Sequence, residues 1–210
     1  MHILLTGATG YIGKRLLPVL AQQGHQITCL VRDAQRMEVP ESIRHLVSLV
    51  EGDLLKAESL QKIPEDIEAA YYLVHSMSSG GDYEKLEEKS AKNFKDHIGQ
   101  TQVKQVVYLS GMINEDKLSK HLKSRKQVEE ILGESSYALT TLRAGIIIGS
   151  GSASFEIIRD LVEKLPVMIA PRWLNTRCQP IGITDVIQAL SGALNKEQCF
   201  NQSFDLGGPD

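Results

Sequence analysis

Cysteine is scarce in this sequence, and its few thiols are not arranged like metal ligands. Cys29, Cys178 and Cys199 are far apart, and none belongs to a C-x-x-C pair or to a Cys/His pair with the spacing of a metal site. We therefore expect no metal centre. Unpaired cysteines are typical of a reducing compartment, and the first residues, MHILLTG, lack the basic segment of a signal peptide. These features predict a cytoplasmic protein.

The sequence also lacks a long apolar run and a strong charge of either sign. No apolar stretch approaches the ~18 residues that cross a bilayer, so we expect no membrane insertion. The net charge of −3 gives no electrostatic reason to expect nucleic acid as a partner. The basic segment KLSKHLKSRK, residues 117–126, is followed at once by Glu129 and Glu130, and we interpret most of its lysines as a solvated helix face.

What the sequence does have is a regular alternation of short apolar runs with segments of helical periodicity. The apolar runs predict strands at 2–6, 25–31, 45–52, 69–75, 103–111, 138–149 and 203–208. The periodic segments predict helices at 11–24, 54–62, 82–99, 116–133, 152–164 and 184–194. Nearly continuous apolar strands that alternate with helices predict an α/β fold, a Rossmann-like doubly wound parallel sheet with helices on both faces.

The domain organisation is expected to be simple. Residues 1–210 are predicted to form a single domain, with a small substrate-side region within about 150–200. The chain stops at LGGPD, directly after a predicted strand and without a closing helix. One interpretation is that it was cut from a longer protein, and the sequence leaves this open.

A glycine motif, TGATGYIG, lies between the first predicted strand and the first predicted helix. In a strand–loop–helix context, Gly7 allows a tight turn, Gly10 lets a pyrophosphate approach the backbone, and Gly13 lets helix and strand pack closely. The phosphates would then accept hydrogen bonds from the free amides of the helix N-terminus. A plain strand-to-helix turn is the alternative, but the context favours a dinucleotide site.

The end of the second predicted strand bears on the choice of cofactor. It reads LVRD, and Arg32 takes the position from which an arginine can bind the 2′-phosphate of NADP, with Arg36 near enough to assist. Asp33 is the counter-argument, because a register shifted by one residue would give it the ribose contact of an NAD site. We predict NADP, with NAD as the alternative. After the third strand, Asp53 could bind the adenine amino group or simply cap a helix that begins at Leu54.

These motifs together resemble the short-chain dehydrogenase/reductase superfamily, and most of all its atypical, NmrA-like and extended members. The resemblance rests on TGATGYIG, LVR, GDL, YYLVHSM, VVYLSG and LRAGIIIG and covers essentially the whole chain. Members of this superfamily include quinone and ketone reductases, redox-sensing regulators without catalysis, and an accessory subunit of respiratory complex I. More narrowly, YYLVHSM, HLKSR and the run from IIIGSGSASF to APRW resemble a bacterial group of NAD(P)-binding proteins that often carry a further C-terminal domain.

The resemblance implies a role for each matching position. The pyrophosphate loop would comprise Gly7, Thr9, Gly10, Tyr11, Ile12 and Gly13. Arg32 would meet the adenosine ribose or its phosphate, and Asp53 and Leu54 would flank the adenine. The nicotinamide side would be lined by Val74 and His75, at the end of the fourth strand, and by Ala144, Gly145 and Ile146. Ser110 takes the position of the superfamily's catalytic serine.

The superfamily's proton donor, however, is missing. Active reductases of this type carry a tyrosine and, four residues later, a lysine on one helical face, and none of the six tyrosines here is followed by lysine at that spacing. In the resemblance, His121 takes the tyrosine position and Arg125 the lysine position. Arginine can hold a ribose but cannot lose a proton near neutrality, whereas histidine can donate one. A cofactor-facing helix without any acid is the favoured interpretation, and His121 as the acid is the alternative.

The sequence therefore supports NAD(P) binding and leaves three candidate functions for the protein. We expect an NADP-dependent reductase that acts on a small carbonyl or quinone. A non-catalytic NAD(P)-binding redox sensor that acts through a partner is the alternative. A sugar-nucleotide epimerase is a weaker one, since the missing tyrosine and the short substrate region count against it. The expected partners are a small-molecule substrate and, from the resemblance, a C-terminal domain or a protein partner.

Overall fold

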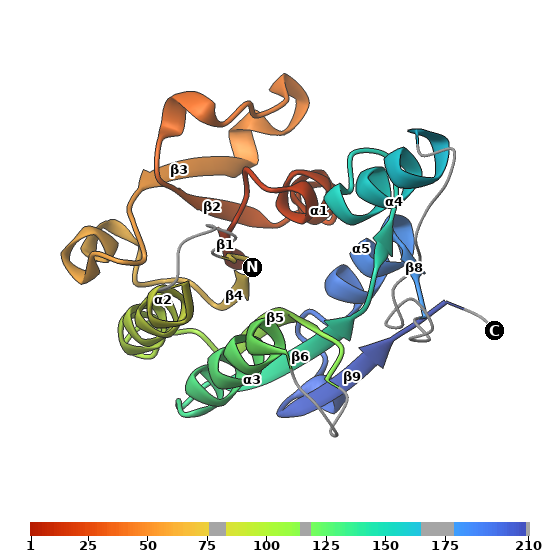
Figure 1. Ribbon diagram of the computed structural model, residues 1–210. Coiled ribbons are helices and arrows are strands. Elements are labelled where there is room, and N and C mark those ends of the chain that lie inside the picture. The colour runs from red at the N-terminus through yellow and green to blue at the C-terminus, as the bar shows by residue number, and fades with distance from the viewer. Residues whose placement is uncertain (76–82, 114–118, 165–178, 209–210) are drawn as a thin grey trace.

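The computed structural model of the chain describes residues 1–75, 83–113, 119–164 and 179–208. Its main feature is a parallel sheet of seven strands in the order β3-β2-β1-β4-β5-β6-β9 (Figure 1). These strands are β1 (His2–Thr6), β2 (Gln26–Val31), β3 (Val47–Glu51), β4 (Ala69–Tyr72), β5 (Gln105–Gly111), β6 (Ala138–Ala144) and β9 (Gln202–Leu206).

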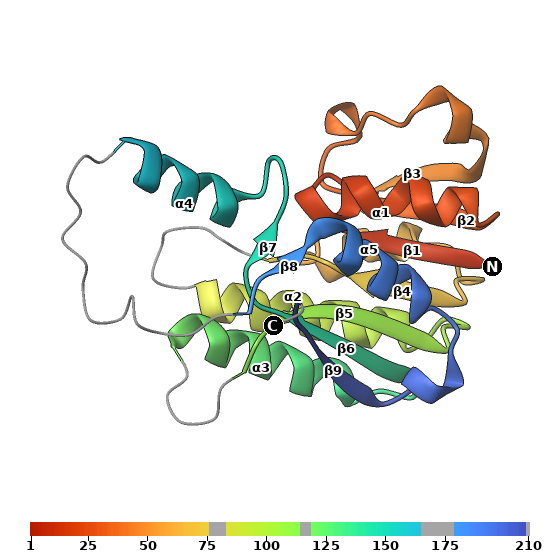
Figure 2. The ribbon, with the colours of Figure 1, turned by 90° about the vertical axis from the view of Figure 1, so that its right-hand side faces the viewer.

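Helices cover both faces of the sheet, with α1 and α5 on one face and α2 and α3 on the other (Figure 2). Side chains of one strand alternate between the two sides. In β1, Ile3 and Leu5 belong to the core under α1 and α5, whereas Leu4 belongs to the core under α2 and α3. The predicted doubly wound fold is confirmed. The helices are α1 (Tyr11–Gln22), α2 (Tyr83–Ile98), α3 (Lys120–Gly133), α4 (Ala153–Lys164) and α5 (Ile183–Gly192).

Short elements complete the described structure. A second, two-stranded parallel sheet pairs β7 (Ile147–Ile148) with β8 (Ile181–Gly182). The connections contain the 3₁₀ helices η1 (Ala34–Arg36) and η2 (Glu41–Leu46), both between β2 and β3, and η3 (Ala57–Lys62) and η5 (Glu197–Cys199).

The chain order of the strands reverses at the centre of the sheet. From β1 the chain moves outward through β2 to β3, and from β4 it moves outward in the other direction through β5 and β6. β1 and β4 are therefore neighbours whose following loops diverge, and they pair from Ile3↔Ala69 to Leu5↔Tyr71. Ligands of open parallel sheets bind at such a switch point, beyond the carboxyl ends of the strands.

Two predicted strands run at least three residues past their observed ends, β4 (Ala69–Tyr72) and β6 (Ala138–Ala144). β4 ends at Tyr72 rather than at His75, because the Leu73 amide donates to the Thr6 side-chain hydroxyl, with N···O of 3.2 Å, instead of extending the strand ladder. The strand predicted at 138–149 is interrupted after Ala144, where the chain leaves the main sheet and Ile147 pairs with Ile181 in the small sheet.

The α-helix predicted at 54–62 was also wrong. The backbone here forms a turn followed by the 3₁₀ helix η3. Side chains satisfy the backbone in place of a helical ladder, since the Leu55 amide donates to Asp53 Oδ1 at 3.0 Å and Ser59 Oγ bridges the Asp53 amide and the Lys56 carbonyl. Local bonds of this kind compete with regular helix formation.

Candidate dinucleotide site

The glycine loop joins β1 to α1 so tightly that side chains would not fit. Gly7 has a φ of 71°, and a Cβ there would lie 2.5 Å from the Leu73 carbonyl oxygen. A Cβ on Gly13 would lie 2.3 Å from the Gly7 carbonyl oxygen. The Gly10 amide closes the loop by donating to that same carbonyl, with N···O of 2.9 Å. The backbone path itself therefore requires glycine at positions 7 and 13.

Helix α1 begins directly after Gly10 with an uncapped end. Within the described residues no side chain accepts a hydrogen bond from its first amides, and its first turn contains no acidic residue. The amides and the dipole of such a helix end favour an anion. Because the loop also lies at the sheet's switch point, this end of α1 is suited to a phosphate group.

Two adjoining cavities flank the loop, and they share Gly7, Gly10, Leu73 and His75 in their walls. We call them the Arg32 hollow, of about 460 Å³, and the Arg125 hollow, of about 570 Å³. The predicted residues that line the Arg32 hollow are Gly7, Thr9, Gly10, Arg32, Asp53, Leu54, Val74 and His75. Those that line the Arg125 hollow are Gly7, Gly10, Tyr11, Ile12, Gly13, His75, Ser110, His121, Arg125, Ala144, Gly145 and Ile146. The structure thus brings all the predicted site residues to one cleft.

In the Arg32 hollow, Arg32 and Asp33 lie differently. Arg32 is exposed in the wall of the hollow, next to the end of β2. Asp33 is not a lining residue. Its Oδ1 accepts the Gln35 amide at 3.0 Å, and its Oδ2 lies 3.6 Å from Arg36 Nε. Asp33 therefore caps η1 and pairs with Arg36, while Arg32 has no carboxylate within ion-pair distance among the described residues.

Asp53 is both tied to the backbone after β3 and placed in a cavity wall. Its carboxylate accepts the Leu55 amide, which ties it to the turn after β3, and it also lines the Arg32 hollow beside Leu54. Leu54 is 6% exposed and belongs to the core under α2. The pair forms a fixed wall of this hollow.

In the Arg125 hollow, Arg125 and His75 form a direct contact. Arg125 Nη1 lies 2.7 Å from His75 Nε2, and because a guanidinium can only donate, the imidazole nitrogen is the acceptor. Burial lowers the pKa of His75 well below its ordinary value, and the charges of Arg125 and His121 lower it further. His75 is therefore neutral near pH 7, with its proton on Nδ1.

Ser110 and Arg125 each present an unsatisfied donor. Ser110 is 2% exposed at the end of β5, and its Oγ is near enough to the Tyr108 phenol to affect that phenol's pKa, but no partner meets hydrogen-bond geometry. Arg125 Nε is buried and likewise has no partner among the described residues. Buried polar atoms without a partner are uncommon in proteins, and these two lie in the wall of the Arg125 hollow.

His121 lies one helical turn before Arg125, at the rim of the same hollow. α3 begins at Lys120, and the Ser119 hydroxyl caps it by accepting the Leu122 amide at 3.3 Å. The His121 side chain is exposed, and its ring centroid is 6.3 Å from that of Tyr83 at the start of α2. The predicted helical face is therefore present, but its histidine is in contact with solvent.

Sequence reasoning missed several lining residues. Met112, Leu122 and Ser152 line the Arg125 hollow, and Leu86 and Ser90 line the Arg32 hollow. Met112, Leu86 and Ser90 belong to no motif. Leu122 and Ser152 lie within HLKSR and IIIGSGSASF, but these motifs assign them no role. All five reach the cleft because α2, α3 and the start of α4 pack around the strand ends. The amphipathic pattern of α2, with Leu86 and Ser90 at i, i+4, is the one signal that could have found two of them.

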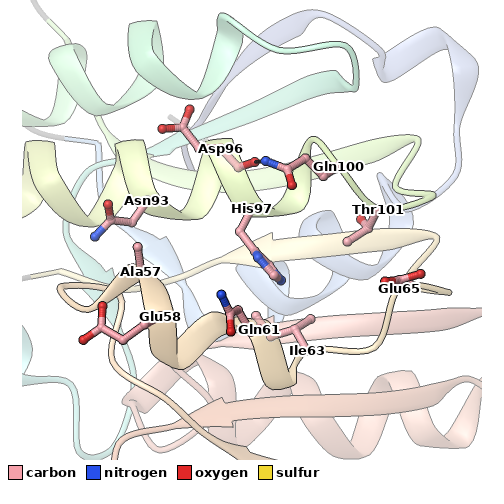
Figure 3. A pocket seen from close by; sticks show the side chains of 10 residues that line it. All are labelled: Ala57, Glu58, Gln61, Ile63, Glu65, Asn93, Asp96, His97, Gln100 and Thr101. Atoms are coloured by element: carbon pink, nitrogen blue, oxygen red, sulfur yellow. Dashed lines mark hydrogen bonds between the residues drawn. The ribbon is translucent and has the colours of Figure 1, made fainter.

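A third cavity, of about 560 Å³, lies away from these hollows between η3 and the end of α2 (Figure 3). It shares no residue with either hollow. The His97 ring projects between Gln61 and Ile63, and burial lowers the pKa of His97. No group of three or more His, Cys, Asp or Glu side chains suited to a metal ion occurs in the described part of the chain. Nothing connects this cavity to the predicted chemistry.

The fold and cleft agree with the comparisons to known proteins. The NAD(P)H-binding family model matches residues 7–160, and the chain belongs to this family. The cofactor class predicted from the glycine loop is confirmed. The choice between NADP and NAD stays a prediction. Over the residues that are described, no helix has the length and apolar character needed to cross a lipid bilayer.

Curated relatives are similar over nearly the whole chain. The mitochondrial NADH dehydrogenase [ubiquinone] 1 alpha subcomplex subunit 9 of Arabidopsis thaliana is 25% identical over 97% of this chain and 53% of its own length. The chloroplastic divinyl chlorophyllide a 8-vinyl-reductase of the same plant is 23% identical over 100% of this chain and 54% of its own length. The chain thus spans about half the length of these relatives.

Solved structures share the fold at low sequence identity. Yeast methylglyoxal/isovaleraldehyde reductase complexed with NADPH superposes with a TM-score of 0.78 at 15% identity, covering 99% of this chain and 78% of that one. A UDP-glucuronic acid 4-epimerase mutant from Bacillus cereus, with NAD and a fluorinated sugar nucleotide, gives 0.78 at 19% identity over 100% and 78% of the two chains. Both NADPH and NAD therefore occur in proteins of this shape.

Proposed function

We propose that this protein is an NADP(H)-dependent oxidoreductase that moves hydride between the nicotinamide and a small carbonyl or quinone. The observation that carries the proposal is the pair of adjoining hollows. One presents an exposed arginine, the other presents buried unsatisfied donors, and the glycine loop with the free end of α1 lies between them. A dinucleotide has the same order of parts, with a pyrophosphate between two nucleosides.

The residues present fit such a cofactor. Gly7 and Gly13 keep the loop tight, because a Cβ at either position would meet backbone atoms, and the free α1 amides at its end would bind a pyrophosphate. Arg32, Asp53 and Leu54 would hold the adenosine part. His75, Val74 and the segment 144–146 would lie at the nicotinamide part. The bound cofactor supplies the hydride and accepts it back.

The preference for NADP rests on the different positions of two neighbouring side chains. Arg32 lines the hollow without a carboxylate partner among the described residues, whereas Asp33 is engaged by η1 and Arg36. A guanidinium binds a phosphate through parallel charge-assisted hydrogen bonds. A carboxylate directed away from the hollow is poorly placed to bind ribose hydroxyls. NADP is therefore the better match.

Ser110, His121 and Arg125 would act at the substrate end. Arg125 would hold the nicotinamide ribose or the substrate oxygen, with Ser110 beside it. His121 is exposed at the rim, so any proton it gives is exchanged readily with water. The favoured interpretation remains a helix that orients ligands without a dedicated buried acid, with His121 as the alternative source of the proton.

The relatives support a reductase more than an epimerase. One curated relative is named as a vinyl-reductase, whereas the fold itself is shared by reductases and epimerases alike. The mitochondrial NADH dehydrogenase subunit supports the second candidate, a NAD(P)-binding module that works within a larger assembly. The missing Tyr-x-x-x-Lys pair favours that candidate as well. A cytoplasmic location and a further C-terminal domain or protein partner remain predictions.

Binding and turnover measurements separate these candidates. Purified protein is titrated with NADPH and NADH by nicotinamide fluorescence, and absorbance of the reduced cofactor is then followed with a panel of quinones and aldehydes. We expect tight NADPH binding and turnover with at least one acceptor. Tight binding without any turnover would favour the non-catalytic module, and no binding of either nucleotide would remove both candidates.

If turnover is found, one substitution decides the role of His121. His121→Ala lowers kcat if the imidazole supplies the proton. An unchanged kcat excludes this role and supports the interpretation without a dedicated acid. Lys123→Ala, which removes another exposed polar side chain from the same turn of α3, is the matched control.

A further inference from the structure

Tyr11, the first residue of α1, lines the Arg125 hollow. All six tyrosines of the chain lie in its described part, and the other five line neither hollow. The Tyr11 hydroxyl is buried and has no hydrogen-bond partner among the described residues. Buried hydroxyls without a partner are uncommon, because water and protein groups normally satisfy them. An unsatisfied phenolic O–H group therefore lies beside this hollow.

A cation lies on the face of the Tyr11 ring. Arg15 is one turn further along α1, and its guanidinium carbon lies 3.9 Å from the centroid of the ring. Arg15 Nη1 donates to the Tyr11 carbonyl at 3.1 Å, and Nη2 donates to the Ser150 carbonyl at 2.8 Å. Both acceptors are neutral. Among the described residues no carboxylate lies at ion-pair distance from Arg15, in contrast to Arg143, which pairs with Glu129 at 2.7 Å. The positive charge of Arg15 therefore remains next to the phenol.

Tyr11 and Arg15 form on α1 a tyrosine–cation pair of the spacing that α3 lacks. The sequence contains no Tyr-x-x-x-Lys, but Tyr11 is followed by a different cation four residues later, and the structure brings the two side chains into contact. A positive charge beside a phenol stabilises the negative charge that develops on its oxygen as the proton leaves. Arginine supplies this charge without exchanging protons itself. The pair therefore has the parts of a general acid.

Two other buried groups near the hollow are less suited to give a proton. The Tyr108 hydroxyl already donates to the Arg125 carbonyl at 3.4 Å, and burial raises the pKa of Tyr108 to about 12. His75 is a neutral imidazole that accepts from Arg125, and a neutral imidazole is a very weak acid. The Tyr11 hydroxyl differs from both, because it has no acceptor and a cation lies against its ring.

The turn from Gly149 to Gly151 covers Tyr11. A Cβ on Gly149 would lie 2.5 Å from the Tyr11 hydroxyl oxygen, and a Cβ on Gly151 would lie 3.7 Å from the ring. Ser152, which follows this turn, lines the same hollow. The hydroxyl is closed off from water in the free protein, so a substrate reaches it when the turn moves outward. Contacts of catalytic groups are often completed only when the substrate binds.

We propose that Tyr11 is the catalytic acid of this protein and that Arg15 positions its ring and stabilises the phenolate. This inference rests on the proposed reductase function. In the step, hydride from the reduced cofactor, which is thereby oxidised, adds to the carbonyl carbon of the substrate. A C–H bond forms, and the electron pair of the C=O π bond takes the proton of the Tyr11 hydroxyl. The alcohol leaves, and water returns a proton to the phenolate and becomes hydroxide.

A binding measurement tests the contact with substrate without any turnover. Benzamide is an unreactive analogue of benzaldehyde, and its carbonyl oxygen can accept the Tyr11 hydroxyl. Its affinity is measured by NMR titration in the presence of NADPH. We expect Tyr11→Phe to weaken benzamide binding about fivefold or more. NADPH affinity should be nearly unchanged, because phenylalanine keeps the ring and the backbone amide. Unchanged benzamide affinity, or no benzamide binding by the wild type, would overturn the proposal.

Turnover separates an acid from a side chain that only supports the structure. With NADPH, Tyr11→Phe should lower kcat for benzaldehyde about a hundredfold. The loss should be smaller for 4-nitrobenzaldehyde, because its alkoxide is less basic and needs less help from an acid. Tyr83→Phe, which removes the hydroxyl of a tyrosine that lines neither hollow, is the matched control. An unchanged kcat in Tyr11→Phe, or an equal loss for the two aldehydes, would overturn the role of Tyr11 as the acid.

Variants of Arg15 test the positioning cation. Arg15→Met should lower kcat for benzaldehyde about tenfold, and Arg15→Lys, which restores a charge, should recover part of the loss. Lys14→Met removes the adjacent exposed cation and should retain kcat. An Arg15→Met variant with unchanged kcat would refute the role of Arg15. If neither aldehyde is reduced but benzamide binding depends on Tyr11, the reductase function fails while the contact with substrate stands. Turnover that does not depend on Tyr11 would refute this inference alone.

Discussion

The Arg32 hollow and the Arg125 hollow share the glycine loop, but they present their arginines in different ways. Arg32 is exposed to water, and the acidic side chain next to it is engaged elsewhere. Arg125 is partly buried and is held by a neutral imidazole. A water-exposed charge contributes modestly to the free energy of ligand binding and mainly selects between ligands. A charge with little water around it interacts more strongly with its ligand. The first hollow is therefore suited to recognition and the second to chemistry.

The largest expected effect comes from the loop that both hollows share. Gly13→Ala places a Cβ 2.3 Å from the Gly7 carbonyl oxygen and 2.7 Å from Ala8 Cα, so the backbone of the loop must move. We expect loss of measurable NADPH binding and a decrease of about 1–3 kcal/mol in the free energy of unfolding. Gly192→Ala is the control, since its Cβ meets nothing within 4 Å. Retained NADPH affinity in Gly13→Ala would show that the cofactor does not depend on this loop.

A smaller effect distinguishes the two cofactors in the Arg32 hollow. Arg32→Ala should weaken NADPH binding about tenfold to a hundredfold, because charge-assisted bonds to the 2′-phosphate are lost, and should change NADH binding much less. Arg36→Ala, which removes a cation paired with Asp33, should have the lesser effect on NADPH. Equal losses for NADPH and NADH in Arg32→Ala would refute the assignment of NADP.

The pH dependence of stability tests the buried imidazole of the Arg125 hollow. The folded state lowers the pKa of His75 from 6.5, through burial first and then through Arg125 and His121. As the pH falls below about 6.5, the unfolded chain takes up a proton that the folded imidazole does not. The stability that the neutral imidazole contributes is therefore present above about pH 6.5 and is lost as the pH falls below it, by at most about 1.4 kcal/mol per pH unit. His75→Gln should reduce this slope, measured by urea unfolding at several pH values.

In His75→Gln, the dependence of the unfolding free energy on pH should be reduced but not abolished. Burial also lowers the pKa values of His25 and His97, which contribute with the same sign. His97→Gln is a useful control, because its cavity lies apart from the cleft and the variant should leave NADPH binding unchanged. A slope identical to that of the wild type in His75→Gln would mean that His75 is not the neutral group inferred from its contact with Arg125.

The smallest effect on cofactor binding is expected from a substitution of Asp33, the residue that would contact the ribose in an NAD site. Asp33→Ala removes the cap of η1 and should lower the free energy of unfolding by about 1 kcal/mol. Because its carboxylate faces η1 and Arg36, the ratio of NADPH to NADH affinity should change little. A marked loss of NADH binding alone, measured by the same fluorescence titration, would show that Asp33 reaches the ribose.

Local sequence signals predicted the Arg32 hollow better than the Arg125 hollow. The glycine loop and Arg32 follow directly from strands β1 and β2, and the turn after a strand is encoded within a few residues. His75 and Arg125 are 50 residues apart, and their contact arises only when α3 packs against β5 and β6. The resemblance placed Arg125 in the cleft, but it gave no indication that a neutral imidazole would hold it.

The predicted boundaries of two elements were wrong for a related reason. The predicted strand to His75 was stopped at Tyr72 by a hydroxyl of β1, and the predicted helix from Leu54 was replaced by side-chain bonds of Asp53 and Ser59. Periodicity reports which residues are apolar, but it does not report which side chain will take over a backbone hydrogen bond. Both departures occur at the carboxyl ends of strands, where the cleft lies.

The central claim is that one dinucleotide occupies both hollows at once. Saturation-transfer difference NMR of the protein with NADP⁺ tests it most directly, because adenine and nicotinamide protons give separate signals. The account predicts saturation of both rings, with the adenine signal reduced most in Arg32→Ala and the nicotinamide signal reduced most in Arg125→Met. Saturation of the adenine ring alone, unaffected by Arg125→Met, would contradict it.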